Sequence, residues 1–270
     1  MDKFYTVPTM AAKCINSVGS RYNWMDWDLV VEPSAGNGSF LLQIPHQNRI
    51  GIDISPDHPD VVTGDFLEWA PPTHARNILV IGNPPFGRVS SLAVKFFNQA
   101  AQWASVIAFI VPRTFRRPSI HNKLDPNFHL ELDEEIPTSP CAFSPPMMAK
   151  CCFQIWKRRP AVRERIKLPT THDDWEFLAF GPKDDAGQPT PPRGADLALR
   201  AYGGRCGEIR TVGLDGLRPK SWHWIRSRIE KNLLISRFES IDYSVSLDTA
   251  RQNSIGRGEL VMLYSRLETV

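Results

Sequence analysis

The sequence lacks several features that would point to a membrane, secreted or metal-binding protein. No apolar run approaches the roughly 20 residues that cross a bilayer, and the opening MDKFYTVPTM has no long apolar signal segment. The five cysteines are an odd number without any CxxC spacing, and only Cys151 and Cys152 are neighbours. We therefore expect reduced thiols, no metal site, no membrane partner and an intracellular protein of the cytoplasm or nucleus that is not secreted.

The net charge of the chain is also small, only +3 at pH 7. That value does not by itself indicate a nucleic-acid-binding protein. The basic residues are nevertheless bunched, around Arg113–Arg117, from Lys157 to Lys167 and from Arg218 to Arg228, while acids gather at 131–135. Each basic run alone is equally typical of a solvated face.

Short apolar runs alternate with helix-like segments through the first 160 residues, which predicts an α/β, Rossmann-like doubly wound sheet. We expect a helix to open over 38–44 and another over 90–104. The predicted strands cover 29–31, 50–54, 61–66, 78–81, 105–112, 128–136 and 151–156.

The remainder of the chain has a different character, so we divide it into a cofactor-binding domain, 1–160, and a C-terminal accessory or substrate-recognition region, 161–270. Residues 181–194 are rich in Pro, Gly and Asp and predict a loop or linker. Strands are expected over 175–180 and 222–227, and a helix over 257–267. The tryptophans at 222 and 224 fit the buried side of a half-exposed strand better than a nucleic-acid surface.

A glycine-rich turn follows the first strand, in the stretch VVEPSAGNGSF. Gly36 and Gly38 would let the backbone approach a ligand closely, although an ordinary turn would also explain them. Leu41 stands where a dinucleotide fingerprint needs its third glycine, and no P-loop occurs. Glu32 precedes the turn and would repel a pyrophosphate but attract a cationic cofactor.

Two acids end the next strands. Asp53 could accept hydrogen bonds from ribose hydroxyls, as the corresponding acid does in dinucleotide sites. Asp65 could accept from an exocyclic adenine amine, with Phe66 flanking the ring. Together with the glycine turn, this ordered set predicts a positively charged adenosyl ligand.

The fourth strand ends in Asn83-Pro84-Pro85-Phe86, a turn that cannot continue a ladder of hydrogen bonds. The Asn83 amide oxygen and the Pro84 carbonyl could accept both hydrogens of one planar NH₂ group. Fixed acceptors favour a pyramidal nitrogen whose lone pair can attack an electrophile. Phe86 could stack on the ring that carries the amine. A simple strand terminator is the alternative.

The motifs EPSAGNG, GIDIS, GDF and NPPFG, in this order, resemble the class I S-adenosylmethionine-dependent methyltransferases, and more narrowly those that modify adenine at N6. The resemblance covers residues 4–112 and, more loosely, the chain to 157. It implies a seven-stranded sheet, S-adenosyl-L-methionine as cofactor, a catalytic NPPF motif at Asn83, Pro84, Pro85 and Phe86, and nucleic acid as partner. The N-terminal FYTVPTMAAKCI resembles the segment that lines the methionine end of the cofactor. The implied cofactor-binding residues are Tyr5, Thr6, Pro8, Glu32, Pro33, Ala35, Gly36, Gly38, Asp53, Ile54, Asp65 and Phe66.

Many DNA enzymes of this group carry tyrosine where Phe86 stands, whereas phenylalanine occurs in enzymes acting on ribosomal RNA or cap-proximal adenine. We favour DNA methylation slightly and keep RNA as the alternative. Phosphates would be contacted by Arg113, Arg116, Arg117 and Lys123, which otherwise read as a solvated loop.

Three other functions stay open at this point: a protein glutamine methyltransferase, a non-catalytic nucleic-acid-binding subunit and a nicotinamide dehydrogenase. The oligomeric state is open as well.

Overall fold

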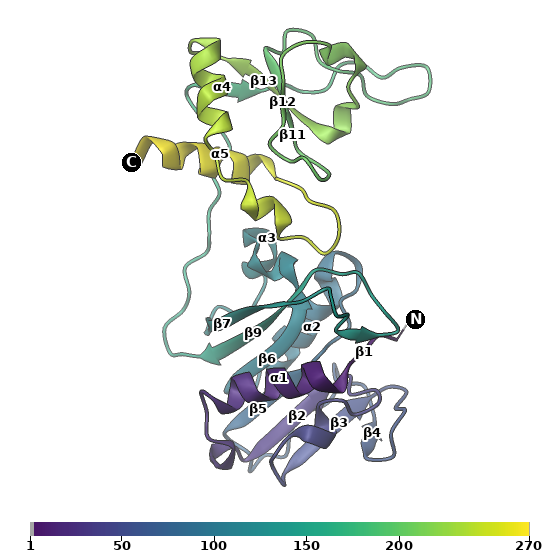
Figure 1. The fold of residues 1–270 in the computed structure, drawn as a ribbon. Coiled ribbons are helices and arrows are strands. Elements are labelled where there is room, and N and C mark those ends of the chain that lie inside the picture. Colours follow the sequence, from purple (N-terminus) through teal and green to yellow (C-terminus); the bar gives the residue numbers. More distant parts are fainter. Residues whose placement is uncertain (1–2, 270) are drawn as a thin grey trace. The chain divides into compact units, whose positions relative to one another are not determined.

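A computed structural model describes residues 3–269, and the chain divides into two compact units, one up to Arg165 and the other from Ile166 onward (Figure 1). Each unit has its own sheet and its own hydrophobic core. No helix among residues 3–269 is long and apolar enough to span a membrane.

The first unit is built on a seven-stranded sheet in the order β4-β3-β2-β5-β6-β9-β7. The strands from β4 to β6 are parallel, and β9 runs antiparallel to both of its neighbours. This order and these directions confirm the predicted fold class. The bounds are β2 Leu29–Pro33, β3 Arg49–Asp53, β4 Val61–Thr63, β5 Ile78–Gly82, β6 Val106–Pro112, β7 Phe128–Ile136 and β9 Cys151–Arg158.

Helices cover both faces of this sheet, which is why its central strands are apolar on both sides. Every residue of β5 and β6 is buried. Helix α1 (Pro8–Gly19) packs with one core cluster and α2 (Ser91–Ala100) with the other. The neighbours Cys151 and Cys152 belong to opposite clusters, as alternating strand residues must. The unit also contains α3 (Pro118–His121) and a small pair, β1 (Tyr5–Thr6) with β8 (Phe143–Ser144).

The helix predicted over 38–44 is wrong, because only a short 3₁₀ turn, Leu41–Gln43, forms there. Pro45 disfavours a helical conformation at Ile44 and ends the turn. The strand predicted over 61–66 stops at Thr63, where the chain turns away at Gly64. The helix predicted over 90–104 is present as the shorter α2.

The second unit has a four-stranded antiparallel sheet in the order β10-β13-β11-β12. Its elements are β10 Trp175–Phe177, β11 Leu197–Arg200, β12 Ile209–Arg210, β13 Trp222–Ser227, α4 Lys231–Glu239 and α5 Arg257–Ser265. The strand predicted over 222–227 is confirmed with both tryptophans buried, whereas the one predicted over 175–180 ends at Phe177. The helix predicted over 257–267 is present as α5, and residues 181–194 form a loop within this unit.

Candidate functional site

The predicted site residues follow strands that end at one edge of the first sheet. The glycine turn follows β2, Asp53 ends β3, Asn83 follows β5, and Arg113 follows β6. Strand order reverses between β2 and β5, since the chain adds strands to opposite sides of this pair. In open α/β sheets, ligands bind in the crevice outside the carboxyl ends of the strands at such a reversal. The site is therefore assembled by topology from segments distant in sequence.

The glycine turn has a backbone that few side chains tolerate. Gly36 and Gly38 have φ values of 51° and 76°, and Ser34, which is not a glycine, has 55°. A Cβ atom on Gly36 would lie 2.6 Å from Cε1 of Tyr5, so the aromatic ring is packed directly on the turn. A hydrogen bond also fixes the turn to the end of β3, because the Gly36 N–H donates to Asp53 Oδ2 at 2.9 Å.

Glu32 is buried beneath this turn, where its Oε2 accepts the Leu41 N–H at 2.7 Å. Burial raises the pKa of Glu32 to about 8. The carboxyl group is therefore mostly protonated at neutral pH. Its negative charge, predicted to attract a cation, would develop only as a nearby positive charge lowers the pKa.

The two predicted ribose and adenine acceptors have different surroundings. Asp53 is 8% exposed, and its Oδ1 accepts the Ser55 N–H at 2.8 Å, so both of its oxygens already shape the backbone. A carboxylate oxygen can accept more than one hydrogen bond, so these contacts leave capacity for a ligand. Asp65 is exposed and accepts the Leu67 N–H at 2.8 Å.

The two apolar residues that follow these acids in the sequence differ in their exposure to solvent. Ile54 is 73% exposed beside Asp53. Phe66 is 2% exposed and packs against Phe96 and Trp103, with ring centroids 5.3 and 5.9 Å away. The structure thus brings Ile54, and not the Phe66 ring, to the surface next to the acids.

The N-terminal segment lies over the glycine turn. The Tyr5 hydroxyl donates to Asp57, and Lys3 Nζ contacts Asp57 Oδ2 at 2.8 Å and the Ser55 carbonyl at 2.7 Å. These hydrogen bonds from Lys3 and Tyr5 lower the pKa of Asp57. Sequence reasoning missed Lys3 and Asp57, because only a folded chain brings two groups 54 positions apart together.

Two more residues of that segment were predicted to line the cofactor. Thr6 is 4% exposed, and its Oγ1 is buried without a hydrogen-bond partner among the residues that the structure describes. A buried hydroxyl without a partner is costly, which makes it a candidate ligand contact. Pro8 begins α1 and is exposed.

Asn83 has its amide held in one orientation. Its Nδ2 donates to the Phe4 carbonyl at 3.4 Å, a long bond that turns Oδ1 the other way. Oδ1 is buried and accepts no hydrogen bond from any residue in the described range 3–269. Likewise, no hydrogen bond from that range ends on the carbonyl oxygen of buried Pro84. Two neighbouring acceptors are therefore left for an outside donor.

The rest of the motif connects this site to the next helix. Pro85 and Phe86 are half-buried, and the Phe86 ring packs against the core cluster that contains α1. The Phe86 carbonyl also satisfies the first turn of α2, because it accepts the N–H groups of residues 92 and 93. Val89 and Ser90 then adopt φ values of 50° and 59°. A β-branched residue rarely adopts such a backbone, so the connection to α2 is strained.

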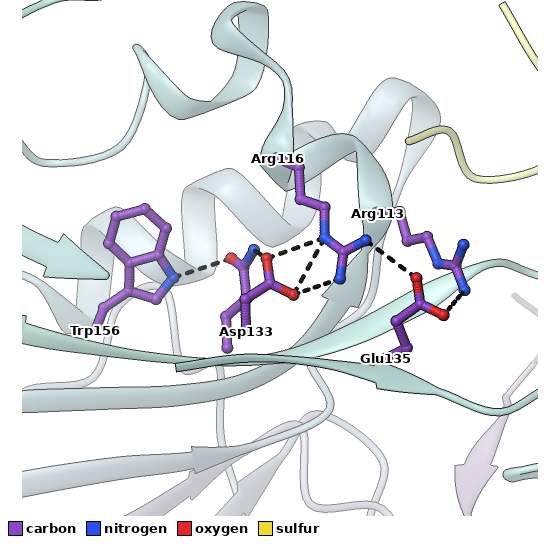
Figure 2. Close-up of polar contacts among 6 residues, drawn as sticks. Arg113, Arg116, Asp133, Glu135 and Trp156 are labelled. Atoms are coloured by element: carbon purple, nitrogen blue, oxygen red, sulfur yellow. Dashed lines mark hydrogen bonds and ion pairs between the residues drawn. The ribbon is translucent and has the colours of Figure 1, made fainter. Parts of the chain in front are cut away.

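The arginines predicted to bind phosphates are instead paired with acids of β7. Figure 2 shows Arg116 Nη2 against Asp133 Oδ1 at 2.6 Å and Arg113 Nη2 against Glu135 Oε2 at 2.8 Å. Asp133 also accepts from Gln154, 2.9 Å away, which links this cluster to β9. A phosphate would have to compete with these carboxylates for both guanidinium groups.

The two other predicted phosphate contacts lie nearby in the chain. Arg117 is half-buried at the start of α3, and Lys123 is exposed just after that helix. Within residues 3–269, no three His, Cys, Asp or Glu side chains come together as they would to hold a metal ion.

Comparisons with known proteins concern the fold. No family model matches the sequence, and no curated protein matches it. Among solved structures, the 23S rRNA methyltransferase ErmE aligns at 17% identity and a TM-score of 0.43, covering 59% of this chain and 71% of its own. The magnesium protoporphyrin IX methyltransferase ChlM from Synechocystis aligns at 13% and 0.44, covering 56% and 79%. Likenesses this distant say nothing about activity or substrate, and the fold assignment rests on the strand order itself.

Proposed function

We propose that the first unit is an S-adenosylmethionine-dependent methyltransferase that modifies the N6 amine of adenine in nucleic acid. The observation that carries this proposal is the buried Asn83 Oδ1, which has no partner among residues 3–269 and precedes Pro84, whose carbonyl oxygen also accepts no hydrogen bond from that range. A buried acceptor without a partner costs about 1–3 kcal/mol, a cost that a bound donor removes. An exocyclic NH₂ group offers two hydrogens to two adjacent acceptors.

The residues around the glycine turn fit an adenosyl cofactor with a positive charge. The turn and Tyr5 would hold its methionine part together with Thr6, whose buried hydroxyl has no partner within residues 3–269. Asp53 would accept from the ribose, Asp65 from the adenine amine, and exposed Ile54 would cover the adenine ring. When bound, S-adenosylmethionine supplies a methyl group already activated on sulfur.

The protein's own part in the reaction is to orient and polarise the substrate amine. Asn83 and Pro84 draw both N–H groups toward fixed oxygens, which pyramidalises the nitrogen and directs its lone pair. Phe86 offers a half-buried ring as a stacking platform for an extruded base. Holding the reacting groups in this geometry and matching the charges supplies the rate enhancement.

The direct test is mass spectrometry of nucleosides after incubation of the full chain with cofactor and, separately, DNA and RNA. We expect N6-methyladenine in one pool, at levels that vanish without cofactor. A third reaction with a protein mixture tests the glutamine alternative. Methylated glutamine with unmodified nucleic acid, or no transfer to any pool, would overturn the proposal.

A further inference from the structure

The sheet of the second unit has two faces of different character. Leu197, Leu199 and Ile225 pack against α4 and α5 in the main core of this unit. Trp222 and Trp224 point to the opposite face, where they pack with Ala198 under a few loop residues. Among the described residues of this unit, no α-helix packs on that second face, which is covered by loop segments and the 3₁₀ turn at Leu214–Gly216.

Arginines collect around the tryptophans on this second face. In the antiparallel pairing, Arg200 faces Trp222, Arg210 faces Ala198, and Arg226 faces Glu176. Directly opposed residues project to the same side of a sheet, so these three arginines share one face. Two further arginines join them through shared carboxylates. The arginine face is defined as Arg200, Arg205, Arg210, Arg226 and Arg228, with Glu176 and Glu208 between them.

The carboxylates cannot balance the positive charge. Glu208 is contacted by Arg200 at 3.2 Å, Arg205 at 3.3 Å and Arg210 at 2.7 Å. Glu176 is contacted by the remaining two, at 3.4 and 2.9 Å. Each carboxylate thus holds several guanidinium groups in place while leaving an excess of positive charge. The Arg113–Arg116 cluster of the first unit differs, because two acids there meet two arginines.

The excess charge is open to solvent. The side chains of Arg205, Arg210, Arg226 and Arg228 are 69%, 50%, 48% and 51% exposed. Arg200 is anchored, with its guanidinium 5.4 Å from the Trp222 ring and its Nε donating to the Tyr202 carbonyl. Tyr202 itself is 48% exposed and adds an aromatic surface beside the arginines.

We propose that the arginine face binds the phosphate backbone of nucleic acid. Guanidinium forks match phosphate oxygens, and ordering by Glu176 and Glu208 lowers the entropy lost on binding. Contacts of this kind position a substrate without reading its sequence. The inference deepens the proposed function, on which it rests for the class of substrate, by naming where the polymer would be held.

The test is fluorescence anisotropy of the full chain with labelled single-stranded DNA, duplex DNA and single-stranded RNA of equal length, over a range of salt. The variants are Arg205→Ala/Arg210→Ala and, separately, Arg226→Ala/Arg228→Ala. The matched control is Arg266→Ala, because this exposed arginine follows α5, which packs on the other face of the sheet. Circular dichroism establishes that each variant is folded. Vesicles containing phosphatidylserine provide a second polyanionic probe.

We expect each double variant to weaken oligonucleotide binding about 10-fold at 0.1 M salt and to reduce the salt slope by about 2, with Arg266→Ala unchanged. Folded variants with the wild-type slope, or a wild-type chain that binds vesicles but no oligonucleotide, would overturn the inference. Methyl transfer is measured on the same samples. N6-methyladenine formation with unaltered binding rejects the arginine face alone, whereas salt-dependent binding without any methyl transfer rejects the proposed function alone.

Discussion

The first unit collects its polar groups at strand ends, whereas the second unit arranges them across a sheet face. In the first sheet, Asp53 and Asn83 come to one edge because β3 and β5 both run parallel to β2 and therefore end on the same side. In the second, Arg200, Arg210 and Arg226 share a face only because of an antiparallel register. Residues that gather at the ends of parallel strands can therefore be inferred from the order of motifs in the sequence. Residues that share one face of an antiparallel sheet can be inferred only when the register of strand pairing is known.

The largest expected effect tests the strand-end group of the first unit. Replacing Asn83 with alanine removes the orphaned acceptor, so methyl transfer should fall about 100-fold or more, with cofactor affinity nearly unchanged. Rates are measured with labelled cofactor and affinity by calorimetry. Asn77→Ala is the control, since it lies at the opposite end of β5 and bonds the Asp26 carbonyl at 2.8 Å. An Asn83→Ala protein with half the wild-type rate would contradict the role of Asn83 as an acceptor at the strand ends of the first unit.

The glycine turn should show the next effect. A methyl group on Gly36 would collide with Tyr5 at a φ of 51°, so Gly36→Ala should weaken cofactor binding about 10-fold. Gly64→Ala is a matched control, because its Cβ would meet only Ile52 at an ordinary 3.5 Å. Calorimetric titration of both variants measures the difference. Equal affinities for the two would show that Tyr5 and the turn do not hold the cofactor.

A smaller effect concerns the ion pairs in Figure 2. Asp133→Ala leaves Arg116 mostly buried without its shortest partner, so the free energy of unfolding should fall by about 1–3 kcal/mol. Asp60→Ala should change it by less than about 0.5 kcal/mol, since Asp60 is 68% exposed. Urea unfolding measures both. If the two variants are equally stable, Arg113 and Arg116 are available for phosphate after all.

The smallest expected effect on cofactor binding is a pH dependence carried by Glu32. Its pKa is about 8 in the folded chain and 4.5 as an ordinary value, so the folded state binds more protons between these pH values. Its contribution to stability therefore falls as pH rises through that window. A cationic ligand favours the ionised form, so cofactor affinity should rise several-fold from pH 6 to 8. Glu32→Gln should flatten both profiles, and an unchanged profile would remove Glu32 from the site.

More of the fold than of the detailed chemistry of the site could be predicted from the sequence. Apolar strands and turn residues predicted the doubly wound sheet, and strand-end positions predicted the gathering of the glycine turn, Asp53 and Asn83. The orientation of Phe66 could not be predicted, because an aromatic residue after a strand can face either a ligand or the core. The pairing of Arg116, which follows β6, with Asp133 of β7 depends on β9 joining these two strands in one sheet, which no local motif specifies.

The claim that Asn83 and Pro84 accept a substrate amine is tested most directly by a crystal structure. The crystal would contain the full chain, S-adenosylhomocysteine and an adenine-containing oligonucleotide from whichever pool is methylated. We predict an unstacked adenine whose N6 lies about 2.7–3.2 Å from both Asn83 Oδ1 and the Pro84 carbonyl oxygen. An adenine bound elsewhere while the Asn83 oxygen stays without a partner would contradict the account.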